Sequence, residues 1–304
     1  MAELVPKADS SIQVTTGSCS PALASAAGSF SVPQTTSVPE PGTKLGFGVL
    51  VFAEKRLDGK LLWLELRAGK GNVLAGAVLQ ELVAHLRGHQ DDPRLRCAVI
   101  AAAGNHFSFG ASVEEHQPDQ AAAMLATFHQ AVRAIAGFPL PVVAAVQGKC
   151  LGGAFEVALA CHVVLASPTA QFACPEIKLG VFPPVLAVLG PLRLGSALSD
   201  RLLLTGAELP AQAAGQCGFA EILSGEAFEA EVLGWVERHF AGLSGYCLRV
   251  ATAAVRQTSA LQTALGADLD AAERRYLQQL LPSHDGNEGI AAFLARRSPL
   301  WRDA

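Results

Sequence analysis

The sequence has no dense run of lysine and arginine. Its 304 residues carry 23 Lys and Arg against 27 Asp and Glu, a formal net charge of −4. Nucleic acids and anionic membranes attract proteins mainly through clustered positive charge, so neither is expected as the main partner. A small molecule or another copy of the chain fits this charge balance better.

Paired cysteines and clustered histidines are also missing. The seven cysteines form no C-x-x-C pair and follow no secretory leader, so we expect reduced thiols in a cytoplasmic protein. None of the eight histidines belongs to a His-Glu-x-x-His motif, and the nearest approach is "EEH" at 114–116. Adjacent residues of one segment rarely converge on one ion, so no metal site is predicted.

Long apolar runs are absent as well. No run reaches the roughly 18 residues that a membrane-spanning helix requires. Residues 1–43 are rich in Ser, Thr, Pro and Ala, without a strong hydrophobic block or a basic start. This composition indicates a mostly disordered leader rather than a signal or transit peptide.

From Leu45 onward, short apolar runs alternate with helical patterns. Residues 46–54 and 61–68 flank "KRLDGK", whose Asp-Gly marks a turn, and they predict a β-hairpin. A helix over 72–89 with Asn72 as its N-cap is expected next, followed by a buried strand over 96–104.

The alternation continues to about residue 193. Strands are expected at 141–148, 162–167 and 170–174, and helices at 124–138 and 152–161. The remaining patterns are mainly helical. An α/β core capped by helices accounts for this order of elements.

One helical segment, "CLGGAFEVALAC" at 150–161, places a carboxylate among apolar residues. The other side chains of the helix are Ala, Phe, Val, Leu and Cys, so the helix has no polar face that would bring Glu156 to water. Either Glu156 is buried, or it lies at a local edge and extends outward. A buried carboxylate without a cationic partner has a raised pKa, which suits a general acid or base near neutral pH.

Glycines mark two places where backbone N–H groups could meet a ligand. Gly152 and Gly153 stand at the start of the same helix, where N–H groups lack intrahelical partners and carry partial positive charge. A developing oxyanion is one natural occupant, and tight strand–helix packing is the other reason for glycine here. A second glycine-centred stretch, at 101–116, could expose another N–H near Gly110 and Ala111.

A second carboxylate, Glu176, follows Pro175 in "QFACPEIKLG". Proline suits the first position of a helix, so Glu176 either complements the helix dipole in the first turn or reaches into an apolar site. In the second case, Glu156 and Glu176 could share one water molecule.

These segments, in their order and spacing, resemble the crotonase (enoyl-CoA hydratase/isomerase) superfamily over roughly residues 46–302. The specific parts are "FSFGAS", "VVAAVQGKCLGGAFEVALACHVVLAS" and "AQFACPEIKLGVFP". The resemblance implies an α/β fold, in which a spiral of ββα units at 44–225 precedes a helical C-terminal region at 226–304. It also implies homotrimers or dimers of trimers, with oligomer and CoA contacts in the C-terminal region.

The resemblance also implies roles for single residues. The backbone N–H groups of Ala111 and Gly153 would bind the thioester oxygen of an acyl-CoA. Glu156 would help to activate a water molecule, and Glu176 would deliver a proton to carbon. No metal or redox cofactor is implied, because coenzyme A is part of the substrate.

In the final helix, Phe293 and Arg296 occupy positions that often help to bind the CoA nucleotide of a neighbouring subunit. A solvated basic helix end is the alternative explanation for these two residues.

The sequence departs from the family pattern in two places. Ser112 stands where Asp is frequent, and Pro183, Pro184, Val185 and Leu186 replace a glycine-rich turn. Prolines stiffen the backbone, so we expect a reshaped acyl pocket that is lined by Phe109 and by residues 183–185. Such a wall disfavours a long linear enoyl group.

The stretch "FSFGASVEEH" resembles most the branch that hydrates cyclohexa-1,5-diene-1-carbonyl-CoA, the ring formed when benzoyl-CoA is reduced. A compact alicyclic acyl group would fit the altered wall, which favours a hydro-lyase of aromatic compound catabolism. The alternatives are a generic short-chain enoyl-CoA hydratase or isomerase, and a catalytically silent relative that binds RNA or supports assembly.

Overall fold

The computed structural model describes residues 49–304, and the predicted leader at 1–43 lies outside the described residues. The first elements are β1 (Val51–Arg56) and β2 (Leu61–Leu66), which pair antiparallel. Between them Leu57, Asp58 and Gly59 have φ values of 53°, 56° and 82°. An Asp-Gly turn tolerates this left-handed backbone, and the predicted hairpin is confirmed.

A six-stranded sheet forms the base of the fold, in the order β1-β2-β3-β4-β6-β9, and it is parallel from β2 onward. Its further strands are β3 (Cys97–Ala102), β4 (Val142–Val146), β6 (Val163–Ala166) and β9 (Glu221–Ile222). The buried strands β3 and β4 are continuous apolar runs, as parallel strands covered on both faces require.

The strands β5 (Lys149–Leu151), β7 (Gln171–Ala173) and β8 (Glu208–Pro210) form a separate three-stranded sheet. In the chain, β5 precedes the helix at Gly153–Ala160 and β7 follows it. In this sheet β7 pairs parallel with β5 and antiparallel with β8. Strands β5, β8 and β9 were not predicted, because runs of two or three residues show no period.

The first two helices are α1 (Gly76–His89) and α2 (Ala121–Ala136). The N-cap prediction for Asn72 is wrong, because Ala75 precedes the first turn of α1. Asn72 has a left-handed φ of 45°. Its side-chain amide donates to the carbonyl oxygens of Ala103 and His106. Asn72 therefore fixes a loop after β3 instead of starting a helix.

Three helices surround the predicted site. Helix α3 (Gly153–Ala160) is buried along its whole length, as its sequence predicted. Helix α4 (Pro184–Leu194) begins in the segment that the sequence marked only as a stiff wall, with Pro184 in its first turn. Proline has no N–H and a fixed φ, so it starts a helix readily. Helix α5 (Ser196–Thr205) follows directly.

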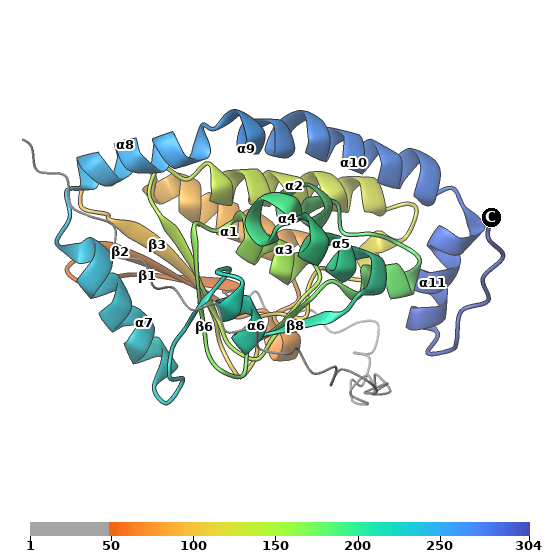
Figure 1. The fold of residues 1–304 in the computed structure, drawn as a ribbon, viewed down its shortest axis with the longest axis horizontal. Helices are drawn as coiled ribbons and strands as arrows, with labels where there is room; N and C mark the ends of the chain where they lie inside the picture. Colours follow the sequence, from red (N-terminus) through yellow and green to blue (C-terminus); the bar gives the residue numbers. More distant parts are fainter. Residues whose placement is uncertain (1–48) are drawn as a thin grey trace, which may run out of the picture. The chain divides into compact units, whose positions relative to one another are not determined.

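The C-terminal half is mainly helical, as predicted. Its helices are α6 (Ala211–Gln216), α7 (Phe228–Val236), α8 (Gly245–Arg256), α9 (Ser259–Thr263), α10 (Leu269–Arg275) and α11 (His284–Leu294). Figure 1 shows α8, α9 and α10 as an arc across α2 and α4, with α11 beyond its end. All described residues belong to one compact unit, and the division at residue 225 stays a prediction.

Residues of the spiral and of the C-terminal helices share one hydrophobic core. Phe155, Leu186 and Tyr276 are all part of it. Within residues 49–304, no helix has the length and apolar character needed to cross a membrane.

Candidate active site

Glu156 lies in the first turn of α3 with 4% of its surface exposed. Its Oε1 accepts hydrogen bonds from the backbone N–H groups of Val185 (2.7 Å) and Leu186 (2.9 Å), in the first turn of α4. The outward orientation is therefore wrong. Burial raises the pKa of Glu156 to about 7, although both N–H donors favour the ionised form.

Glu176 lies in the short 3₁₀ helix η3 (Pro175–Leu179). The residue as a whole is half-buried, but its carboxylate points inward, and Oε2 is buried without a hydrogen-bond partner among the described residues. Burial and, after it, the negative charge of Glu156 raise the pKa of Glu176 to about 8. The structure thus brings the two predicted carboxylates within electrostatic reach of each other.

The two carboxylates have unequal surroundings, and this decides where a shared proton resides. Glu156 has two N–H donors that stabilise its negative charge, and Glu176 has none from another residue. At neutral pH the pair favours one proton, located on Glu176, because two buried charges repel each other. This arrangement supplies one base and one acid to the same site.

The loop after β3 meets the start of α3 at close range. A Cβ atom on Gly110 would lie 2.6 Å from Leu151 O and 3.4 Å from Gly153 N. A Cβ atom on Gly153 would lie 3.4 Å from the Ala111 side chain. The structure therefore places Ala111 beside Gly153, the first residue of α3, whose N–H has no intrahelical acceptor. A carbonyl oxygen held there would feel the positive end of the helix.

Helix α11 packs on η3 with almost no space between the two backbones. A Cβ atom on Gly289 would lie 2.1 Å from Leu179 O, and one on Gly180 would lie 2.3 Å from Asp285 O. Only glycine permits this approach. The C-terminal helix therefore helps to position the segment that carries Glu176.

Tyr276 is a site residue that sequence reasoning missed. It is 1% exposed, and its hydroxyl is buried without a hydrogen-bond partner among the described residues. Its ring lies 5.7 Å from that of Phe182, centroid to centroid, just before α4. Burial and the negative charges of Glu176 and Glu156 raise its pKa. Tyrosine occurs only twice in the sequence, and this scarcity was the available signal.

The remaining predicted residues fall into two groups. Pro183, Pro184 and Val185 are buried at the start of α4, next to the donors that hold Glu156. Phe109 and Phe293 are each 41% exposed. The Phe109 ring lies 5.2 Å from that of His106, centroid to centroid. Arg296, just beyond α11, is also exposed.

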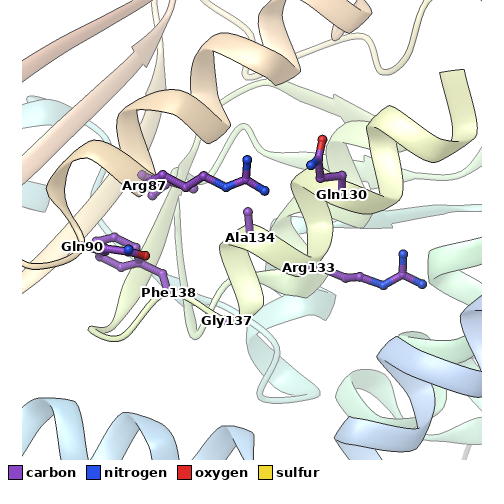
Figure 2. Close-up of a pocket in the computed structure, with 8 residues that line it drawn as sticks. Arg87, Gln90, Gln130, Arg133, Ala134, Gly137 and Phe138 are labelled. Carbon is purple, nitrogen blue, oxygen red and sulfur yellow. The ribbon is translucent and has the colours of Figure 1, made fainter. Parts of the chain in front are cut away.

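A separate surface hollow of about 370 Å³ lies between α1 and the C-terminal end of α2. Figure 2 shows Arg87 and Gln130 on its walls, with Phe138 at one side. Neither Glu156 nor Glu176 lines it, so the acid and base chemistry lies elsewhere. Among residues 49–304, no group of three or more His, Cys, Asp and Glu side chains could hold a metal ion.

The fold and the paired carboxylates agree with a known class of proteins. The family model for enoyl-CoA hydratase/isomerase matches residues 61–304, and the chain belongs to this family. Its curated relatives include hydratases and a dehydratase, which are hydro-lyases.

Several individual members of this family are similar to the chain over most of its length. The chain is 41% identical to the cyclohexa-1,5-dienecarbonyl-CoA hydratase of Thauera aromatica over 81% of this chain and 94% of that protein. It is 33% identical to the 2,3-dehydroadipyl-CoA hydratase of Escherichia coli, over 77% and 91%. A crystal structure of an enoyl-CoA hydratase from Mycobacterium avium subsp. paratuberculosis is 29% identical, with a TM-score of 0.70 over 84% and 99%.

Proposed function

We propose that the chain is an acyl-CoA hydratase that adds water to a conjugated cyclic dienoyl-CoA of the cyclohexa-1,5-diene-1-carbonyl type. The observation that carries the hydratase part is the buried pair of Glu156 and Glu176, with unequal surroundings and raised pKa values of about 7 and about 8. Near neutral pH this pair supplies the base and the acid that hydration needs.

In this mechanism the thioester oxygen is bound by the N–H groups of Ala111 and Gly153. Addition of water to the conjugated double bond sends negative charge to that oxygen, and two preorganised donors would stabilise it by several kcal/mol. Glu156 accepts a proton from the attacking water. Glu176 gives its proton to carbon, so one H and one OH are added in total.

Two observations support the cyclic acyl group. The relative at 41% identity is named a cyclohexa-1,5-dienecarbonyl-CoA hydratase. In addition, Pro183 and Pro184 replace a flexible turn with a buried helix start beside Glu156. A rigid wall at this point favours a compact ring over a long linear chain.

The test incubates purified protein with cyclohexa-1,5-diene-1-carbonyl-CoA and, separately, with crotonyl-CoA, and follows the products by mass. We expect the ring substrate to gain one water molecule at the higher rate. Addition to crotonyl-CoA alone would contradict the ring assignment and favour a generic enoyl-CoA hydratase. If neither substrate gains water, and neither hydrated product loses it, the hydratase proposal is contradicted.

We also propose that Phe293 and Arg296 contact the CoA nucleotide, and that the chain assembles as a trimer or a dimer of trimers. Phe293 lies in the exposed last turn of α11 and Arg296 just beyond the helix, where a ligand or a neighbouring subunit can reach them. Light scattering would give the oligomer size. Phe293→Ala should raise KM for the acyl-CoA with little change in kcat, because the nucleotide is remote from the reacting carbons.

A further inference from the structure

Two arginines meet at the C-terminal end of α3. Arg256, at the end of α8, donates from Nη2 to the carbonyl oxygen of Ala160 at 2.8 Å. Arg193, near the end of α4, donates from Nη2 to the carbonyl oxygens of residues 161 and 162, at 3.1 Å and 3.4 Å. These three carbonyls are consecutive, so both guanidinium groups gather around one helix end.

This pair of positive charges has no negative partner in the part of the chain that the structure describes. Arg256 is 7% exposed, and neither arginine forms an ion pair with any residue in 49–304. Burial, and after it the charge of Arg193, lowers the pKa of Arg256 to about 10. The nearby Cys161 thiol is neutral at physiological pH, because burial raises its pKa to about 12.

His162 adds a third donor to the same place. Its Nδ1 accepts a hydrogen bond from the N–H of Val142 at 3.0 Å. Burial and, after it, the charges of Arg256 and Arg193 lower the pKa of His162 to about 3, so the ring is neutral. With Nδ1 as an acceptor, the proton of the neutral ring lies on Nε2.

Three buried N–H groups around this helix end have no acceptor among residues 49–304. They are Arg193 Nε, Arg256 Nε and His162 Nε2. All three are donors, and the two that belong to arginines carry positive charge. A buried donor without an acceptor is unfavourable. Arg193 is half-buried and Arg256 is buried, and only the partial negative charge of the helix end offsets their two positive charges. A water molecule could accept hydrogen bonds here but would add no negative charge to the partial charge of the helix end.

We propose that the C-terminal end of α3 binds a small inorganic anion, either a halide or a tetrahedral oxyanion. Arg193 and Arg256 supply the charge, and His162 supplies a neutral donor. An anion offers only acceptors, which matches the unfilled donors. This site is separate from the acidic pair and does not depend on the proposed hydratase activity.

The first test measures the midpoint of thermal unfolding in bromide or sulfate, against gluconate at equal ionic strength. We expect the wild-type midpoint to rise in a saturable way with bromide or sulfate. Arg256→Met keeps the length of the side chain but removes one charge, so its midpoint should respond little. In gluconate this variant loses both the repulsion between the arginines and the hydrogen bond to Ala160 O, so the readout is the shift caused by the anion and not the absolute midpoint.

Arg249→Met is the matched control. Arg249 lies on the same helix and also donates to backbone carbonyls, those of Gln90 (2.6 Å) and Asp92 (2.9 Å). Neither carbonyl is one that Arg193 or Arg256 contacts. It should keep the full wild-type response to bromide and sulfate. Arg193→Met provides a second variant if Arg256→Met does not fold.

A crystal grown in bromide tests the position of the anion directly. An anomalous peak within hydrogen-bond distance of Arg256 Nε is expected. An equal response of wild type and both arginine variants would overturn the proposal, because the arginines would then only cap α3. A midpoint that depends on protein concentration and not on the anion would also overturn it, because a carboxylate of a second copy would then fill the site.

Discussion

Gly152 lies directly against Glu176, because a Cβ atom on Gly152 would be 2.6 Å from Glu176 Oε1. Gly152 also has a φ of 52°. The Gly152→Ala variant should therefore push the carboxylate out of place. We expect turnover to fall about 100-fold, the usual effect of a misplacement near 1 Å, while the circular dichroism spectrum stays that of the wild type.

The control for this variant is Gly218→Ala. Gly218 has a φ of 75°, and a Cβ atom there would meet nothing within 4 Å. Gly218→Ala therefore also places an alanine at a positive φ, but without touching the site. A comparable loss of turnover in Gly218→Ala would mean that strain alone, and not the displaced carboxylate, explains the first result.

Neutralising either carboxylate should lower turnover. Glu176→Gln removes the proton donor and Glu156→Gln removes the base, so each should lower kcat by about 10²- to 10⁴-fold. Binding of the acyl-CoA, measured by calorimetry, should change little. Glu226→Gln, at an exposed glutamate, is the control. Full activity in Glu176→Gln would refute the role given to this residue.

The pH dependence follows from the same pair. Below the pKa of Glu156, about 7, both groups are protonated and the base is lost. Above the pKa of Glu176, about 8, both are ionised and the acid is lost. A plot of kcat/KM against pH should therefore be bell-shaped with its maximum between these values. In Glu176→Gln the alkaline limb should disappear from the residual activity.

Stability should fall as the pH rises from about 5 to about 8, between the ordinary and the folded-state pKa of Glu176. The folded-state pKa of Glu176 lies above its ordinary value of 4.5, so the folded protein retains a proton that the unfolded chain has released. Between pH 5 and pH 8 this costs up to a few kcal/mol of unfolding free energy. Glu176→Gln should lose less over this interval in urea denaturation, and an equal loss in both proteins would contradict the buried, unpaired carboxylate.

The Tyr276→Phe variant tests the role of the buried Tyr276 hydroxyl. Because this hydroxyl has no partner in the described structure, its removal should leave the unfolding midpoint unchanged or raise it. If the hydroxyl donates to the acyl group or to the bound water, kcat/KM should fall about 3- to 10-fold, the value of one hydrogen bond. Tyr246→Phe, at a residue 77% exposed, should alter neither quantity.

Features that depend on a local sequence pattern could be predicted from the sequence. The apolar surroundings of Glu156 predicted its burial, and the Asp-Gly turn predicted the first hairpin. Asn72 was misjudged because an asparagine before a helix can equally bind distant carbonyls, and only the tertiary structure decides between them.

Contacts between residues that are distant in sequence could not be predicted. The donors to Glu156 come from 29 and 30 residues away, on a helix whose proline-rich start looked like a wall. Tyr276 approaches the glutamates because α10 packs across α4. The cluster of Arg193, His162 and Arg256 joins three segments with no common motif, so no local pattern could have shown it.

The hydrogen bonds of Glu156 join the first turns of α3 and α4, so two helix N-termini point toward the same small volume. A thioester bound at Gly153 as proposed would lie in an electric field that draws electron density onto its oxygen before any water attacks. Its carbonyl stretching band should then move to lower frequency than in free acyl-CoA. The vibrational spectrum of the bound substrate would thus show, before the reaction, part of the polarisation that the addition of water completes.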